Sequence, residues 1–114
     1  MIKVYGIPNC DKVRKTRRYL EEQNIEYLFY DLRKYGITSS ILSRWVKTLT
    51  WEKLLNRQSV SFRTIPDIDK TLINQKRAIE LMLRIPTLIK RPIIEHKNEI
   101  YIGCTEKVLN ALTT

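Results

Sequence analysis

Residues 2–30 read IKVYGIPNCDKVRKTRRYLEEQNIEYLFY, and three segments of this stretch set the fold class. The first four residues are β-prone, and Gly6 and Pro8 end the run, which predicts a strand. Residues 11–24 keep a helical pattern, for which Asn9 or Asp11 is the expected N-cap. Residues 25–30 again favour a strand. Because a crossover of this length joins parallel strands, the stretch predicts a β-α-β unit.

Residues 34–84 have a different character, because apolar residues recur at helical spacing. In the last part of this stretch, Ile68 and Leu72 are counted with the apolar face of one long helix. The pattern predicts an all-helical insertion at about residues 36–85, between two strand-bearing ends. The expected elements are a helix capped by Thr38 or Ser39 that continues to Leu49, a short helix over 51–55, a loop over 56–63 and a helix over 67–83.

The strand pattern returns after Pro86, which breaks the helical spacing. The two ends together have the order βαβ…ββα, which resembles the thioredoxin arrangement. We therefore expect one α/β domain over residues 1–114, a thioredoxin-like fold with a mixed four-stranded sheet and the helical insertion. The expected C-terminal elements are a helical turn over 86–89, a strand over 91–95, a turn at 97–98, a strand over 99–102 and a helix over 106–112 capped by Thr105.

The composition excludes several classes of protein. A chain of 114 residues with 43% hydrophobic residues suits one domain with a core. Two cysteines cannot form a disulfide-rich scaffold, and with one histidine they cannot supply a zinc finger, so no metal site is expected. The sequence shows neither a signal peptide nor an apolar run long enough for a membrane span, so we expect a cytoplasmic protein without membrane contacts.

The net charge of +9, from 21 basic and 12 acidic residues, allows two interpretations. One is nucleic-acid binding, because clustered cations release counterions from phosphates. The other is a positive surface that favours solubility and attracts small anions. The cations are spread along the chain, most densely over residues 12–18, and no RNA-binding aromatic strand accompanies them. The second interpretation is therefore favoured, and nucleic acid is not an expected partner.

Cys10 is the candidate nucleophile. It follows a strand and enters a helix, whose N-terminal N–H groups favour a thiolate. The alternative is an ordinary buried cysteine. The third residue after Cys10 is Val13, so a local Cys-x-x-Cys pair is absent. Cys104 could resolve a Cys10 intermediate, but a packing role at the end of the last strand is favoured.

Three segments carry a resemblance to a known family: residues 4–11 (VYGIPNCD), 54–56 (LLN) and 89–94 (IKRPII). In order and spacing they closely match the arsenate-reductase-like (ArsC/Spx/MgsR) family, and they resemble its small YffB-type branch most. The resemblance covers essentially the whole chain. It implies a thioredoxin-like fold with a helical insertion, as the element order also predicts.

The resemblance implies roles for individual residues. Cys10 matches the catalytic cysteine of the glutaredoxin-coupled arsenate reductases, and Arg14 stands where they carry an arginine near the thiol. Arg91 matches the arginine that binds the oxyanion, and Pro92 matches the cis-proline of thioredoxin folds. Arg63 occupies the aromatic-arginine position of the YffB-type branch.

Departures from the reductases favour a thiol substrate over arsenate. Asp11 puts a negative charge beside the anion site, and Asn56 stands where a reductase arginine follows the Leu-Leu pair, with Arg57 next to it. Ile102-Gly103 replaces a third arginine, so the usual planar clamp for an oxyanion is incomplete. The expected function is therefore a glutathione-dependent thiol reductase. Its expected binding residues are Asn9, Arg14, Arg57, Arg63, Arg91 and Pro92.

In this mechanism the Cys10 thiolate attacks an oxidised substrate, and glutathione, a co-substrate rather than a bound cofactor, resolves the intermediate. Glutaredoxin is a further expected partner. Three alternatives stay open. One is arsenate reduction proper, and another is a catalytically idle member of the fold. The third is an Spx-like transcriptional regulator that binds RNA polymerase, ranked lower because the Cys-x-x-Cys switch of that branch is missing.

Overall fold

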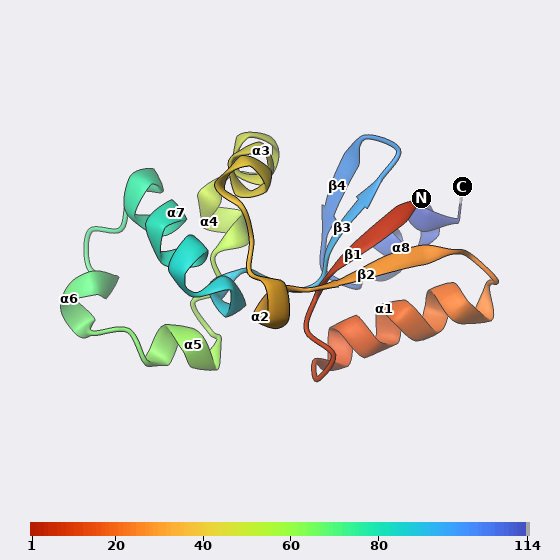
Figure 1. The fold of residues 1–114 in the computed structure, drawn as a ribbon, viewed down its shortest axis with the longest axis horizontal. Helices are drawn as coiled ribbons and strands as arrows, with labels where there is room; N and C mark the ends of the chain where they lie inside the picture. The colour runs from red at the N-terminus through yellow and green to blue at the C-terminus, as the bar shows by residue number, and fades with distance from the viewer. Residues whose placement is uncertain (114) are drawn as a thin grey trace. The chain divides into compact units, whose positions relative to one another are not determined.

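A computed structural model describes residues 1–113, and the chain divides into two compact units (Figure 1). The sheet unit combines Met1–Tyr35 with Arg91–Thr114, and the helical unit is Gly36–Lys90. The helical unit contains the predicted insertion at about residues 36–85 and extends beyond it to Lys90. That the whole chain behaves as one domain stays a prediction. Within residues 1–113, no helix has the length and apolar character needed to cross a bilayer.

The sheet unit has one mixed four-stranded sheet. Its elements are β1 (Ile2–Gly6), α1 (Asp11–Glu22), β2 (Tyr27–Asp31), α2 (Leu32–Tyr35), β3 (Ile93–His96), β4 (Glu99–Ile102) and α8 (Glu106–Leu112). The strand order is β2-β1-β3-β4, with β1 parallel to β2 and the other neighbours antiparallel. This is the predicted thioredoxin-like α/β class. The connection through α1 joins the parallel strands β1 and β2, and the β3–β4 hairpin forms the opposite edge of the sheet.

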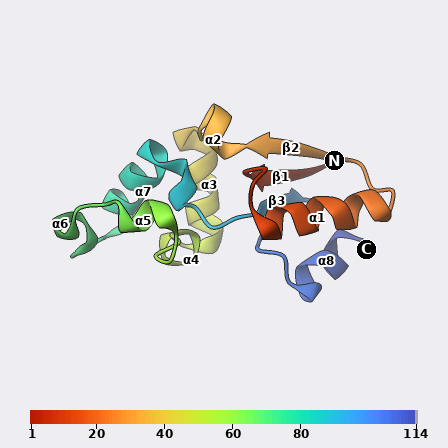
Figure 2. The same ribbon diagram turned by 90° about the horizontal axis from the view of Figure 1, so that it is seen from below.

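One face of this sheet carries the core of the unit. Because side chains alternate along a strand, Ile2 and Val4 of β1 point to the same side as Ile94 of β3. Leu20 of α1 and the apolar residues of α8 pack against them, so both helices cover this one face (Figures 1 and 2). Burial of these side chains fixes α1 against the sheet, and with α1 the loop that precedes it.

Gly6, the last residue of β1, allows α1 to approach the sheet closely. A Cβ atom at this position would lie 2.5 Å from Cγ2 of Val13, whose side chain is fully buried in the first turn of α1. Any side chain here would push the start of α1 away from the sheet. The glycine therefore holds the β1–α1 turn, and with it Cys10, in position.

The helical unit is built from short helices around buried aliphatic side chains. Its elements are α3 (Ser39–Leu49), α4 (Trp51–Leu54), α5 (Val60–Arg63), α6 (Asp67–Lys70), α7 (Gln75–Arg84) and a 3₁₀ turn, η1 (Pro86–Leu88). Two of the sequence motifs meet here: Leu55 and Ile89 form an isolated antiparallel bridge. The backbone N–H groups of Asn56 and Lys90 donate across it to Leu88 and Leu54, both at 2.8 Å.

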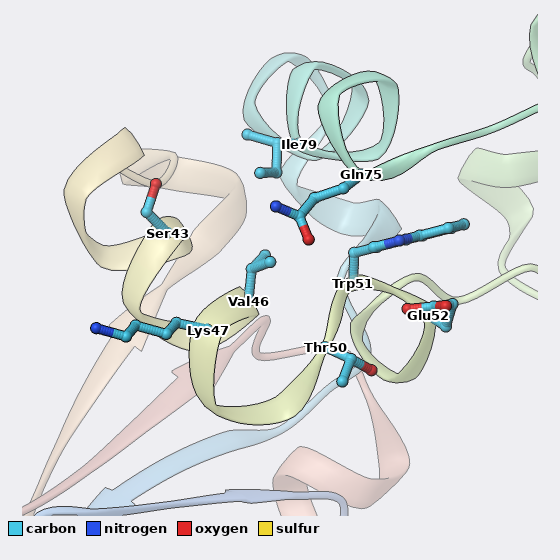
Figure 3. Close-up of a pocket in the computed structure, with 8 residues that line it drawn as sticks. All are labelled: Ser43, Val46, Lys47, Thr50, Trp51, Glu52, Gln75 and Ile79. Carbon is cyan, nitrogen blue, oxygen red and sulfur yellow. The ribbon is translucent and has the colours of Figure 1, made fainter.

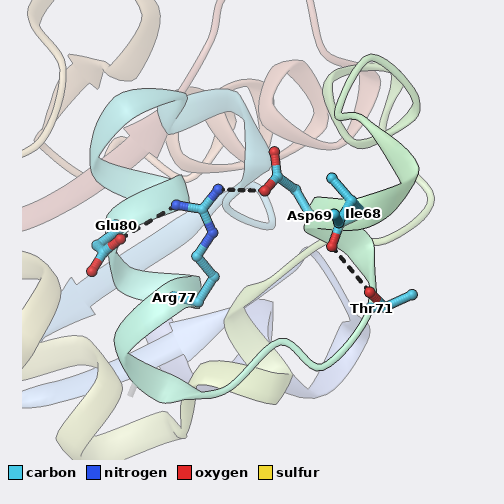
Figure 4. A network of polar contacts seen from close by, with 5 residues as sticks. All are labelled: Ile68, Asp69, Thr71, Arg77 and Glu80. Atoms are coloured by element: carbon cyan, nitrogen blue, oxygen red, sulfur yellow. Dashed lines mark hydrogen bonds and ion pairs between the residues drawn. The ribbon is translucent and has the colours of Figure 1, made fainter.

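The single helix predicted over residues 67–83 was wrong, because the chain breaks between α6 and α7. The Thr71 hydroxyl donates to the carbonyl oxygen of Ile68 at 3.0 Å (Figure 4). Leu72 then takes a positive φ of 52°. Asn74 then caps α7 by accepting from the backbone N–H of Arg77 at 2.9 Å. The guanidinium of Arg77 donates to Asp69 of α6 at 2.8 Å, which ties the two helices together (Figure 4).

Two smaller expectations were also wrong. Neither Asn9 nor Asp11 caps α1: Cys10 is the N-cap residue, and Asp11 is the first helical residue. The predicted loop over residues 56–63 contains the one-turn helix α5, because the Ser59 hydroxyl accepts from the backbone N–H of Phe62 at 3.1 Å.

Candidate functional site

Cys10 is the N-cap residue of α1, at the end of the β1–α1 loop. Its backbone is extended, and its carbonyl oxygen accepts the first helical hydrogen bond, from the N–H of Arg14 at 2.8 Å. An N-cap side chain points toward the free N–H groups of the first turn. The Cys10 side chain itself makes no hydrogen bond to these groups, and Cys10 is partly exposed. The thiol therefore stands at the start of the helix, where a substrate could reach it.

Arg14 binds the two residues on either side of the thiol. Its Nη1 donates to Oδ1 of Asn9 at 2.9 Å, and its Nη2 pairs with the carboxylate of Asp11. Asp11 is almost fully exposed and Arg14 about half exposed, so both stay accessible to a ligand. These contacts join two predicted site residues, Asn9 and Arg14, on either side of Cys10. The Asp11 carboxylate therefore pairs with the Arg14 guanidinium, the cation that was expected to attract an oxyanion.

Arg91 and Pro92 lie at the same end of the sheet as the β1–α1 loop. β3 runs antiparallel to β1 and pairs Ile93 with Tyr5, so the start of β3 adjoins the end of β1. The Arg91-Pro92 bond is cis, as the cis-proline resemblance implied. The carbonyl oxygen of Pro92 accepts from the N–H of Gly103 at 2.9 Å, which fixes this segment to the end of β4.

Arg57 and Arg63 belong to the helical unit. The guanidinium of Arg57 lies 5.8 Å from the ring centroid of Phe62, and the ammonium of Lys70 lies 5.4 Å from the same ring. Arg63 is the last residue of α5 and is exposed. Both arginines are accessible cations, and their part in glutathione binding stays a prediction.

A pocket of about 590 Å³ lies elsewhere in the helical unit (Figure 3). Val46 and Ile79 lie on opposite sides of it, and the amide of Gln75 points between them (Figure 3). None of the predicted site residues lines it. We place the candidate site at Cys10 rather than in this pocket, because Cys10 combines a partly exposed thiol with the start of a helix.

Arg17 lies on α1 seven residues after Cys10 and was not among the predicted site residues. Its Nε donates to the hydroxyl of Tyr27 at 3.1 Å, and its guanidinium lies 4.1 Å from the ring centroid of Phe29. Together with Arg14, Arg18 and Glu21 it lines a groove of about 320 Å³ on α1. The spacing of seven residues from Cys10 on one helix would have indicated it.

Cys104 is not placed like Cys10. It lies between β4 and Thr105, the N-cap of α8, and packs against the core of the sheet unit while remaining partly exposed. This supports the packing role expected for it.

His96 lines a separate groove of about 320 Å³, with Lys3, Glu95 and Lys97 around it. Its Nε2 atom is buried and has no hydrogen-bond partner within the described part of the chain. Burial lowers the pKa of His96, and the positive charges of Lys97 and the amino terminus lower it further. The neutral imidazole is therefore the form that the folded protein prefers.

This preference predicts a pH dependence of stability. Since the pKa of His96 is lower in the folded than in the unfolded chain, the unfolded chain binds more protons below about pH 6.5. The free energy of unfolding should therefore fall as the pH drops below that value, and His96→Gln should remove this part of the slope. Urea unfolding from pH 8 to pH 5 measures it. Equal slopes for both proteins would contradict the prediction.

Comparison with known proteins gives concordant results. The model of the ArsC family matches residues 5–112. An uncharacterised protein of Haemophilus influenzae is 36% identical over 111 residues, covering 97% of both chains. The solved structure of the YFFB protein superposes with a TM-score of 0.93 at 33% identity over the whole of both chains. The global transcriptional regulator Spx 1 of Lactococcus lactis is 28% identical, covering 97% of this chain and 88% of its own.

Proposed function

The chain belongs to the ArsC family, and from this premise we propose that it is a glutathione-dependent thiol reductase with Cys10 as its single nucleophile. The observation that carries the proposal is the position of Cys10 as the uncapped N-cap of α1. In the proposed mechanism the thiolate formed there is held by the free N–H groups of the first turn and by the helix dipole. Such a chemistry requires a reducing compartment, which is why we also propose the cytoplasm.

The proposed reaction is two successive thiol–disulfide exchanges. The Cys10 thiolate attacks the glutathione sulfur of a mixed disulfide, so that a Cys10–glutathione bond forms and the substrate leaves as a thiolate that takes a proton from water. A second glutathione thiolate then attacks the Cys10-bound glutathione. This step releases glutathione disulfide and restores the Cys10 thiolate. The two electrons that reduce the substrate thus come from glutathione, one molecule of which arrives with the substrate.

The surroundings of Cys10 favour a disulfide over arsenate as substrate. Asp11 and Asn9 both occupy the Arg14 guanidinium, so this cation offers a compact oxyanion fewer donors than an unpaired arginine would. A disulfide carries no charge at the reacting sulfur and does not need such a clamp. In the proposed site Asn9, Arg14 and Arg91 hold the carboxylates of glutathione, and Pro92 shapes the backbone beside it. Arg57 and Arg63 of the helical unit are proposed as further glutathione-binding residues on the sequence resemblance alone.

Trapping the intermediate tests the proposal. The protein is mixed with a glutathionylated peptide, quenched with an alkylating reagent and analysed by intact mass and peptide mapping. We expect one glutathione per chain on Cys10, and alkylated Cys104. Glutathione on Cys104 alone, or no adduct at all, would overturn the proposal.

The similarity to the global transcriptional regulator Spx 1 supports a regulatory role as a second candidate function, and binding to RNA polymerase is the form of it that the sequence resemblance implies. Val13 stands at the third position after Cys10, where it is fully buried against Gly6, so this chain has no second thiol for a local switch. Retention of purified RNA polymerase by the immobilised protein, unchanged on oxidation, would favour this candidate. Absence of binding would remove it.

A further inference from the structure

We propose that the surface of α1 next to Cys10 binds an acidic polypeptide segment, and that this segment belongs to the protein whose mixed disulfide Cys10 reduces. The inference rests on the proposed function for the identity of the ligand. The existence of a binding surface is inferred from the positions of Arg17 and Arg18 in the α1 groove. Neither residue takes part in the proposed reaction of Cys10.

The residues that line the α1 groove form a stripe that begins at the thiol. Arg14, Arg17, Arg18 and Glu21 follow Cys10 by four, seven, eight and eleven residues, so all project from the same side of the helix. At 1.5 Å per residue, Arg17 and Arg18 lie about 10 to 12 Å from Cys10 along the axis. A chain bound at the sulfur would reach them within a few extended residues.

Contacts with Tyr27 and Phe29 fix the orientation of the Arg17 guanidinium. Its Nε is fixed by the Tyr27 hydroxyl at 3.1 Å, and its plane is supported by the ring of Phe29 at 4.1 Å. The Tyr27 hydroxyl in turn donates to Glu21, and burial raises the pKa of Tyr27, so it stays protonated and keeps this contact. Within residues 1–113 the two Nη groups of Arg17 have no hydrogen-bond partner. A fixed guanidinium with two open donors is suited to a carboxylate, because little side-chain entropy is lost on binding.

The shape and charges of the stripe favour a row of carboxylates over one compact dianion. The cations are spread along the helix rather than gathered around one point, and Asp11 already pairs with Arg14 at the thiol end. Glu21 closes the other end and would repel a phosphate placed near it. An acidic segment can place single carboxylates opposite Arg17 and Arg18 and avoid both of these acidic residues.

A kinetic comparison tests the proposal. Two glutathionylated peptides differ only in having glutamates or glutamines on both sides of the cysteine, and the rate constant of Cys10 glutathionylation is measured for each. At low salt we expect the acidic peptide to react about tenfold faster, and the difference to vanish near 1 M salt. The double variant Arg17→Gln/Arg18→Gln should lose the preference. Arg18→Gln alone, at an exposed position, should reduce it if the double variant folds poorly.

The matched control removes the same charge from the other side of the same helix. Lys12 and Lys15 are exposed on α1 but do not line the groove. Lys12→Gln/Lys15→Gln should therefore keep most of the preference for the acidic peptide. An equal loss in both double variants would mean that only net charge matters, and would overturn the proposal.

A binding measurement separates this proposal from the proposed function. In the Cys10→Ser protein, an acidic peptide without cysteine is titrated and followed by NMR, with saturable shifts expected at Arg17 and Arg18. If no glutathionylated peptide reacts with Cys10 in the wild-type protein but these shifts occur in Cys10→Ser, the reductase function is refuted and the peptide-binding surface is supported. Absence of saturable shifts overturns the surface, whatever Cys10 does. Displacement of the peptide by an equal concentration of inorganic phosphate would assign the stripe to a compact dianion and overturn the peptide assignment.

Discussion

Cys10→Ser should reduce glutathione-dependent reduction of a mixed disulfide by about 10³-fold or more, the scale on which enzymes lose activity with their nucleophile. A serine hydroxyl in this position keeps the N-cap geometry, and serine is a better N-cap than cysteine, so the fold should be retained. The hydroxyl cannot form the covalent intermediate, because it is not ionised at neutral pH and cannot exchange with a disulfide. Steady-state release of glutathione disulfide measures the loss.

Cys104→Ser is the matched control, since it also changes one sulfur to oxygen. Cys104 packs against the core beside α8, so the change should lower stability slightly and leave the rate per folded molecule unchanged. Persistence of thiol-dependent turnover in Cys10→Ser would disprove the mechanism. A loss in Cys104→Ser as large as in Cys10→Ser would show that two thiols act together.

Gly6→Ala should destabilise the protein by about 1–3 kcal/mol, the usual cost of overpacking. The added methyl group would lie 2.5 Å from Cγ2 and 3.3 Å from Cγ1 of Val13, so the first turn of α1 has to move. Since Cys10 caps that turn, the rate of Cys10 alkylation should change together with stability. Urea unfolding and timed alkylation with iodoacetamide measure the two effects.

Val13→Ala provides the control, because it removes both methyl groups that the new side chain would meet. Combined with Gly6→Ala it should recover part of the lost stability, with a coupling free energy of about 1 kcal/mol or more. Gly103→Ala is the comparison, since its cost arises from a positive φ of 90° with no atoms nearby. That cost should be unaffected by Val13→Ala. Additive effects of Gly6→Ala and Val13→Ala would contradict the steric explanation.

Elements bounded by turn and cap residues were predictable from the sequence. β4 and α8 have the predicted bounds, because Gly103 separates them and the Thr105 hydroxyl accepts from the N–H of Val108 at 3.2 Å. The helix over 67–83 was wrong because apolar periodicity alone does not show burial. Ile68 and Leu72 were counted with its apolar face, yet they are 81% and 96% exposed. Asn74 was the local signal for the cap of a new helix.

The candidate site was predictable where it depends on local chain order. A cysteine between a strand and a helix falls at a helix N-terminus whatever the rest of the fold does, and Cys10 does so. The partners of the arginines could not be predicted in this way. Arg17 meets Phe29 only because β2 pairs in parallel with β1, and Arg14 turns to Asn9 and Asp11 by a choice of rotamer. Contacts between residues of different elements depend on tertiary packing, which the sequence of one segment does not determine.

The antiparallel pairing of β1 with β3 has a consequence for synthesis on the ribosome. Lys3 of β1 pairs in register with Glu95 of β3, so β1 cannot gain this neighbour until the 55 residues of Gly36–Lys90 have been translated. At 5–20 residues per second this takes about 3 to 11 seconds. During that interval the nascent β-α-β segment exposes an unpaired strand edge, which makes it a natural client for chaperones that shield such edges.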